Sequence, residues 1–459
     1  MELKRMSEMH GNCKDCNAPA RSALYGVPLS SVTRAQWLTE METAIGERSG
    51  KVACTANIDF IVKAGEDIQL REILCRADWV LCDGTPVKWL SRLTGPPLPE
   101  RLAGSDMVPH ILNLAHRKGF SVFVLGGREE VNSQALEKIR KDYPGISRVD
   151  GFAPKWAPLE SMPHDQINQK IRECSPDILM VCLGCPKQEK WIDMNRGEWT
   201  VGVALGLGAC VDFMAGTRSR SPQWMRRSGL EWAYRLMQEP RRLCGRYVRD
   251  IAGMGRRLIT QFRRRARHGR DYQAGAVPIQ MRYLVAGDRR VLRLGKSLQA
   301  GQCKEVWQAY GLLAVRPGGE LELDVSELEH TDSWGMGLMI SFWRDIRQTG
   351  GTLVILNAPA WLTDLVSEWG WVGLPGWEMR TADINVNDYH IAGAQTLIGN
   401  GFHDENLDFD ELLRQSRLYT DERVDGQRRP YIRGGDVEKE SGPSHPSESQ
   451  QAEELWIGQ

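Results

Sequence analysis

The pattern of apolar and polar positions alternates between strand-like and helix-like segments over the first half of the chain. Apolar runs of strand length end in glycine or polar residues at "KVACTANIDF", "ADWVLCDG", "GFSVFVLGG", "SPDILMVCLGCPKQE" and "WTVGVALGLGACVDFMAG". Helix-like segments lie between them, for example at 105–118 and 132–143. This alternation is typical of a parallel sheet with helices on both faces. We therefore expect an α/β fold with a Rossmann-like parallel sheet over residues 31–270.

A second alternating unit begins near residue 278. The string "RRVLRLGKSL" is strand-like, "AGQCKEVWQAYGLLA" is helix-like, and residues 319–359 read as strand, turn, helix and strand. We expect a separate small α/β domain over 278–386. Residues 1–30 are expected to be a flexible leader, and the polar, aliphatic-poor residues 387–459 a mostly disordered tail.

Charge is balanced over the whole chain but not along it. Lys plus Arg and Asp plus Glu number 59 each, so net charge predicts no partner. Residues 218–270, however, contain 16 Arg and three acids, with aromatic and aliphatic residues interleaved. This pattern predicts basic amphipathic helices, which bind anionic membrane surfaces or nucleic acid. A solvated helical face with an Arg-rich linker is the alternative, and no recognised nucleic-acid module supports nucleic-acid binding.

The cysteines and the apolar segments indicate in which cellular compartment the protein works. Most of the eleven Cys lie in apolar runs or apart from one another, as reduced thiols in the cytosol do, and the lone pair Cys13 and Cys16 predicts no metal site. The polar N-terminus predicts no signal peptide, and 201–216 is too short and too glycine-rich to cross a membrane. We expect a cytoplasmic protein that meets a membrane only from its surface.

Candidate site residues follow the predicted strands, because ligands bind beyond the carboxyl ends of parallel strands. Polar side chains gather at three strand ends and in one loop before a helix, namely Thr55 and Asn57, Asp83, Gln188 and Glu189, and Arg101 with Asp106. Gly126 and Gly127 form a strand-to-helix turn that could bind phosphate through backbone N–H groups, or that could be a plain tight turn.

Asp83 is the candidate general base. A carboxylate at a strand end can deprotonate a hydroxyl, although an Asp-Gly pair is also common in turns. The chain has no DxD pair, no Walker A loop and no GxGxxG, so nucleotide phosphates would need arginine and backbone groups.

An ordered series of blocks resembles the WecG/TagA/CpsF glycosyltransferase family over about 50–250. The blocks are "TANIDFIV", "ADWVLCDGTPV", "ERLAGSDM", "VFVLGG", "LGCPKQEKWI", "GVALGLGACVDFMAGTRSRSPQW" and "GLEWAYRLMQEPRRLCGRY". The resemblance implies transfer of an amino sugar or related sugar from a UDP-sugar to a polyprenyl-pyrophosphate-linked saccharide, in surface polysaccharide synthesis. It also implies work at the cytoplasmic membrane face, with no metal and no other cofactor.

The resemblance also implies roles for particular residues. Asp83 matches the catalytic base, Thr55 and Asn57 match pocket residues, and Arg101 matches the arginine of an ER-x-x-G-x-D motif. Gln188 and Glu189 match a PKQE motif at the nucleotide-sugar site. The C-terminal segment, which docks near the membrane and can bring arginines to the diphosphate, is matched by Arg220, Glu231, Trp232, Arg235, Pro240 and Arg241.

The second domain resembles a STAS domain through "LELDVSELEHTDSWGMGLMISFWRDIRQTGGTLVILNAP". The resemblance implies that Ser333, after Asp332, is a phosphorylation switch for a kinase or a protein partner. Trp334 departs from the family, where a small residue is usual. We expect a helix to begin near Trp334 with the Ser333 hydroxyl exposed; the alternative is a helix cap without a regulatory role.

We interpret the chain as an inverting, metal-independent UDP-sugar glycosyltransferase, with a STAS domain that regulates or localises it on an anionic membrane. The alternative is a non-catalytic membrane scaffold built on a degenerate transferase domain. Retained Thr55, Asn57, Asp83, Gln188 and Glu189 favour the enzyme. The sequence leaves open the sugar, the acceptor and whether the chain forms oligomers.

Overall fold

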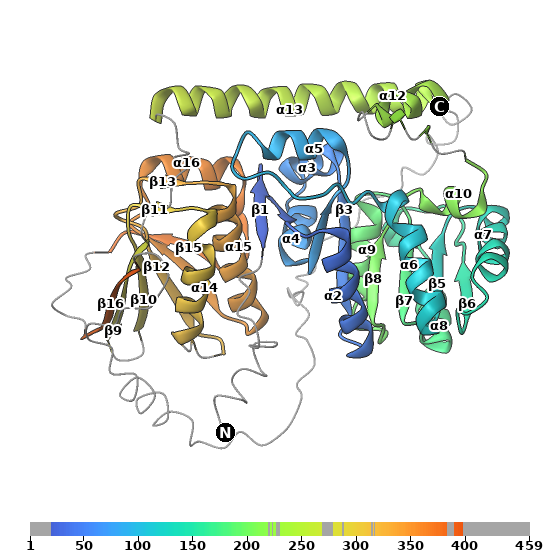
Figure 1. The fold of residues 1–459 in the computed structure, drawn as a ribbon, viewed down its shortest axis with the longest axis horizontal. Coiled ribbons are helices and arrows are strands. Elements are labelled where there is room, and N and C mark those ends of the chain that lie inside the picture. Colours follow the sequence, from blue (N-terminus) through green and yellow to red (C-terminus); the bar gives the residue numbers. More distant parts are fainter. Residues whose placement is uncertain are drawn as a thin grey trace, which may run out of the picture.

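The computed structural model describes residues 20–218, 221–222, 224–225, 230–268, 279–286, 289–313, 315, 317–382 and 390–397. Arg220 and most of the expected leader and tail lie outside these ranges. Within them the chain forms two α/β domains, one around each of two six-stranded sheets (Figure 1).

The first sheet is entirely parallel, as the alternating pattern predicts. Its strands lie in the order β4-β3-β8-β7-β5-β6. Their bounds are β3 (Lys51–Ala56), β4 (Trp79–Cys82), β5 (Val122–Gly126), β6 (Val149–Phe152), β7 (Ile178–Cys182) and β8 (Val203–Gly206). Successive residues of β3 pack into different hydrophobic clusters on the two faces of the sheet. Ala53 belongs to one cluster, and Cys54 belongs to the other. Because both faces are covered, the strands read as continuous apolar runs.

Helices connect these strands and supply the two clusters. They are α2 (Arg34–Gly46), α3 (Ile58–Glu66), α4 (Ile68–Arg76), α5 (Thr85–Ser91), α6 (Gly104–Lys118), α7 (Glu129–Asp142), α8 (His164–Cys174), α9 (Lys187–Asn195) and α10 (Cys210–Ala215). Figure 1 shows the helices flanking the sheet, with α5 and α3 at its upper edge. This edge holds the carboxyl ends of β3 and β4, where α3 and α5 begin.

The second sheet is mixed, with the order β15-β14-β12-β10-β9-β16. Its strands are β9 (Ile279–Ala286), β10 (Arg289–Leu294), β12 (Glu320–Asp324), β14 (Thr352–Leu356), β15 (Trp377–Arg380) and β16 (His390–Leu397). Its helices are α14 (Cys303–Leu312), α15 (Ser333–Gln348) and α16 (Ala360–Glu368), with a short ladder of β11 (Ser297–Leu298) and β13 (His330–Thr331). β16 pairs with β9, so this sheet extends past the expected boundary at 386.

A hairpin of β1 (Arg21–Leu24) and β2 (Val27–Ser30) occupies part of the expected leader, which corrects that boundary. Every residue of both strands is buried. Figure 1 shows β1 between α15 of the second domain and the helices of the first. Ala23 of this hairpin and Cys75 of α4 belong to the hydrophobic cluster of the second domain, so the two domains share one core.

The Arg-rich region forms α12 (Glu231–Gln238) and the long helix α13 (Pro240–His268). In Figure 1 α13 runs along the top of the molecule, from α12 above the first domain to α16 of the second. Large apolar side chains remain exposed on these helices, namely Trp232, Met237, Val248, Ile251, Ile259 and Phe262. Among the described residues, no helix combines the length and the apolar character that a membrane span requires.

Candidate active site

Two cavities of opposite character meet at the carboxyl ends of β3 and β4. The first, called here the polar cavity, has a volume of about 340 Å³ and extends to the loops after β7 and β8. The second, called the apolar groove, has a volume of about 720 Å³ and lies between α5 and helices α12 and α13. Residues that line both are Asn57, Asp59, Asp83, Arg235 and Arg246. Asp83 therefore lies where the two cavities join.

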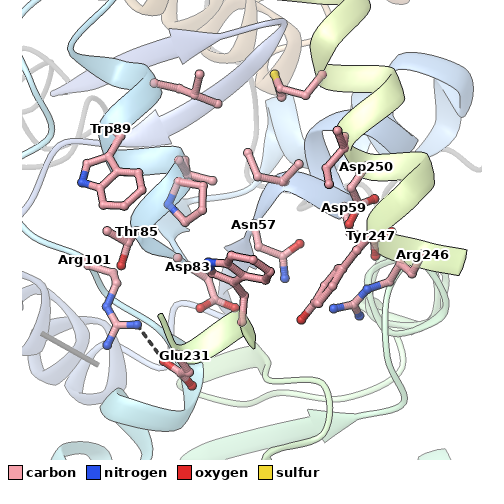
Figure 2. Close-up of a pocket in the computed structure, with 18 of the residues that line it drawn as sticks. Asn57, Asp59, Asp83, Thr85, Trp89, Arg101, Glu231, Arg246, Tyr247 and Asp250 are labelled. Carbon is pink, nitrogen blue, oxygen red and sulfur yellow. Dashed lines mark hydrogen bonds and ion pairs between the residues drawn. The ribbon is translucent and has the colours of Figure 1, made fainter. Parts of the chain in front are cut away.

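The walls of the apolar groove come from segments far apart in the sequence. Pro86, Trp89 and Leu90 of α5 and Leu93 just after it form one wall; the facing wall has Trp232, Tyr247, Ile251, Met254 and Leu258. Figure 2 shows Trp89 and Thr85 across the opening from Tyr247 and Asp250. Such a groove suits an elongated apolar group with a polar head near Asp83.

Asp83 directly follows β4, and its N–H donates to the Ala56 carbonyl oxygen at 2.9 Å. Burial raises the pKa of the Asp83 carboxyl to about 6. The neighbouring charges act in both directions: Arg235 and Arg101 lower this pKa, and Glu231 and Asp106 raise it. A carboxyl with this pKa is mostly charged at neutral pH and is a stronger base than an ordinary aspartate.

An ion-pair network surrounds Asp83. Arg101 Nη1 contacts Glu231 Oε2 at 2.9 Å, and the same guanidinium also pairs with Asp106. Glu231 Oε1 accepts from Arg235 Nη2 at 2.8 Å, one helical turn away. These contacts hold two arginines of different elements beside Asp83, and they raise the pKa of both guanidinium groups despite burial.

Thr55 and Asn57 line the polar cavity from the end of β3. The Thr55 hydroxyl donates to the Gly206 carbonyl oxygen of β8 at 3.0 Å. The Asn57 side chain caps α3 by accepting from Phe60 N at 3.3 Å. Both residues thus fix the ends of the strands that carry the site, and the Asn57 amide group remains in contact with both cavities.

Gln188 and Glu189, in the first turn of α9, are buried, at 1% and 0% exposure. Gln188 Oε1 accepts from Gly208 N at 2.8 Å and Gly184 N at 3.2 Å, and Gln188 Nε2 donates to Glu189 Oε1 at 2.6 Å. Burial raises the pKa of Glu189 to about 7. The pair therefore connects the loops after β7 and β8, and Gln188 also lines the polar cavity.

Several expected site residues do not line either cavity. A Cβ at Gly126 would lie 2.6 Å from the Cys182 carbonyl oxygen, and one at Gly127 would lie 2.9 Å from a Val211 methyl, so close packing explains this glycine pair. Arg241 is exposed, and Asp106, which pairs with Arg101, acts on Asp83 through its charge.

The structure adds residues that the sequence reasoning missed. They are Asp59 and Lys63 on α3 and Arg246, Tyr247 and Asp250 on α13. Lys63 Nζ pairs with Asp59 Oδ2 at 2.8 Å. Within each helix these residues are three or four positions apart, which places them on one helical face. This spacing is the feature of the sequence that could have predicted them.

In the second domain, Asp332 and Ser333 lie at the N-terminus of α15. Asp332 Oδ1 caps this helix by accepting from Trp334 N and Gly335 N, each at 2.9 Å. Ser333 is only 3% exposed, and its hydroxyl lies 2.9 Å from the Ser22 hydroxyl of β1. The expectation of an exposed Ser333 hydroxyl is wrong, because the hairpin of the first domain covers it.

Comparison with known families divides the chain in the same way. The sequence model of the glycosyl transferase WecG/TagA/CpsF family matches residues 22–268. That of the family described as "Mlab, STAS domain" matches residues 281–376. The first match includes the β1–β2 hairpin, apart from Arg21, and the whole of α13.

Several curated proteins named N-acetylglucosaminyldiphosphoundecaprenol N-acetyl-beta-D-mannosaminyltransferase are similar to the first domain. The one from Bacillus spizizenii is 32% identical over 207 residues, which are 45% of this chain and 79% of the relative. The one from Bacillus subtilis (strain 168) is 32% identical over 196 residues, 43% and 75% of the two chains. The one from Staphylococcus aureus (strain MW2) is 27% identical over 226 residues, 49% and 87%.

Proposed function

Because the chain belongs to the WecG/TagA/CpsF family of glycosyl transferases, we propose that it moves a sugar from a UDP-sugar to a polyprenyl-diphosphate-linked saccharide. The observation that carries this proposal is the position of Asp83, which lines both cavities. The UDP-sugar occupies the polar cavity. The polyprenyl chain of the acceptor lies in the apolar groove, with its saccharide toward Asp83.

Asp83 acts as the general base. It accepts the proton of the acceptor hydroxyl while that oxygen forms a bond to the anomeric carbon of the donor. The bond from this carbon to the β-phosphate oxygen breaks, and UDP leaves with the electron pair. A single displacement inverts the anomeric centre, so an α-linked donor gives the β linkage that appears in the relatives' names.

Arginines stabilise the diphosphate that leaves, without a metal ion. Arg235 and Arg246 line both cavities, and Arg218 lines the polar one. A guanidinium can donate two parallel hydrogen bonds to a phosphate, and this stabilisation is strong where water is excluded. Because Glu231 already orients Arg101 and Arg235, little reorganisation is needed when charge develops on the UDP oxygens.

Helices α12 and α13 hold the enzyme on an anionic membrane, on the cytoplasmic face. Exposed Met237, Val248, Ile251 and Phe262 can enter the interface, and the arginines of α13 attract anionic headgroups. Ile251 also lines the apolar groove, so the groove adjoins the membrane-facing surface. A polyprenyl chain could then enter the groove without crossing water.

The donated sugar is proposed to be an N-acetylhexosamine, used in surface polysaccharide synthesis. The relatives' names describe transfer of N-acetylmannosamine to N-acetylglucosamine on diphosphoundecaprenol. At 32% identity or below, these names support the class of donor and of acceptor, and the individual sugars need an assay.

The test uses the full chain with a panel of UDP-N-acetylhexosamines and a polyprenyl-diphosphate N-acetylglucosamine acceptor, with the product identified by mass spectrometry. Asp83→Asn should lower kcat by about 10²- to 10⁴-fold and leave UDP binding by calorimetry nearly unchanged. Asp165→Asn, an exposed carboxyl on α8, is the matched control. Absence of both transfer and UDP binding in the unaltered protein would instead favour a non-catalytic scaffold.

A further inference from the structure

The N-terminus of α15 in the STAS domain is fixed to one loop of the transferase domain. Ser333 N donates to the Thr94 carbonyl oxygen at 3.0 Å, and Trp334 Nε1 donates to the Pro96 carbonyl oxygen at 3.1 Å. Trp334 is the residue at which this chain departs from the usual small STAS residue. Its indole therefore has a defined partner in the other domain.

The same helix is fitted to strand β1. A Cβ at Gly337 would lie 2.1 Å from the Arg21 carbonyl oxygen, so only glycine allows this approach of helix and strand. Farther along α15, Arg344 pairs with Asp78 and donates from Nε to the Arg76 carbonyl oxygen at 3.0 Å. These contacts, with the buried hydroxyl pair of Ser22 and Ser333, make the interface extensive and shape-specific.

The loop that α15 contacts is also tied to helix α5. The fully buried Ser91, the last residue of α5, accepts from Leu98 N through its Oγ at 3.1 Å. The Ser91 carbonyl oxygen accepts from Thr94 N at 3.2 Å. Trp89 and Leu90 of α5, and Leu93 of the loop, line the apolar groove. One continuous set of hydrogen bonds thus joins the STAS helix to a wall of the groove.

We propose that the STAS domain positions the acceptor groove: Ser333 and Trp334 hold loop 92–98, and the loop holds α5 against the polyprenyl chain. This inference rests on the proposed function for the occupant of the groove. It assigns Ser333 and Trp334 as positioning residues, which touch neither donor nor acceptor. The resemblance to STAS domains implies a regulatory serine at Ser333, and in this chain the transferase domain covers that serine.

Gly95 offers a sharp test. A Cβ added at Gly95 would lie 2.6 Å from Ser333 Oγ, whereas its next neighbours, Asp332 Cβ and Ser333 N, are at 3.4 Å. Gly95→Ala should therefore push α15 away from the loop, and adding Ser333→Ala should remove the obstructing atom and restore the contact. Ser333→Ala alone is the matched control, because Ser333 holds the loop through its backbone N–H, which the substitution keeps, and only the side-chain hydrogen bond with Ser22 is lost.

For Gly95→Ala we expect the KM for the polyprenyl acceptor to rise roughly three- to thirtyfold, which lies within the range of coupling between touching residues. The kcat and the UDP dissociation constant should stay close to those of the unaltered protein. The double variant should return the KM to within about threefold of the original, by the same reasoning. A distortion confined to the loop backbone would persist in the double variant and would overturn the inference.

Hydrogen exchange separates this inference from the proposed function. Amides of residues 85–93 should exchange faster in Gly95→Ala and recover in the double variant, whether or not transfer is observed. If the unaltered protein transfers no sugar, the proposed function fails while the exchange result stands. If it transfers sugar and Gly95→Ala changes neither acceptor KM nor exchange, the STAS domain does not position the groove. Rapid phosphorylation of Ser333 in the intact folded chain would also contradict the docked arrangement.

Discussion

The charge of Asp83 should control the acid side of the pH–rate profile. With a pKa of about 6, raised mainly by burial, the carboxyl is roughly nine-tenths charged at pH 7 and one-tenth charged at pH 5. Because only the charged form accepts the acceptor proton, kcat/KM should fall about tenfold over this interval. An ordinary aspartate would keep nearly full activity down to about pH 5.

Two substitutions by neutral residues should shift the acid limb of the pH–rate profile, the part where activity falls at low pH, in opposite directions. Arg235→Gln removes a charge that lowers the Asp83 pKa, so the limb should move to higher pH; Glu231→Gln removes one that raises it, so the limb should move to lower pH. The measurement is kcat/KM for the acceptor between pH 4.5 and 8, with Asp165→Asn as control. A profile that is flat from pH 5 to 7, or limbs that move in the same direction in both variants, would refute Asp83 as the base.

Three further outcomes are expected. Transfer should survive EDTA, because in the proposed mechanism arginines carry the diphosphate charge; loss of activity that Mg²⁺ or Mn²⁺ restores would contradict this. Binding of the full chain to anionic vesicles in a sedimentation assay should weaken from low salt to 1 M salt, where the Debye length falls to about 3 Å; salt-insensitive binding would indicate an apolar anchor instead. The Glu189 pKa of about 7 lies above its unfolded value near 4.5, so the stability that this carboxyl contributes is present below about pH 4.5 and is lost as pH rises through about 7. Glu189→Gln should therefore melt above the unaltered protein at pH 8, with a gap that narrows toward pH 5; melting curves that stay parallel over this range would contradict it.

The sequence predicted the parallel sheet and the position of Asp83 because both depend on local patterns. Each strand is an apolar run that ends in glycine or a polar residue, and parallel strands bring their carboxyl ends to one edge. Asn57, Asp83 and Gln188 all line the polar cavity because they follow strands that end at this edge. Gly126 and Gly127 show the limit of the rule, because a strand end can also owe its glycines to packing.

What the sequence did not predict depends on contacts between distant segments. Arg21, Ser22 and Ser30 are polar, yet all three are buried because other parts of the chain pair with them and cover them. Ser333 is buried for the same reason. The local sequence places it at the N-terminus of a helix, and that local sequence would be the same if another segment covered the serine or left it exposed. The spacing of the apolar residues in α13 indicates which face of this helix is buried. It does not indicate that this face lies opposite α5, because α5 lies about 160 residues earlier in the chain.

The core shared by the two domains limits how far this protein is modular. Two family patterns follow one another along the sequence, yet Ala23 and Cys75 pack in the second core, and Trp371 Nε1 donates to the Gly26 carbonyl oxygen at 3.0 Å. Separating the halves between residues 268 and 279 would expose apolar side chains on both pieces. A deletion of the C-terminal half would therefore first expose the surface of β1 and α4 that this half covers, so any change in activity would have to be separated from that loss of packing.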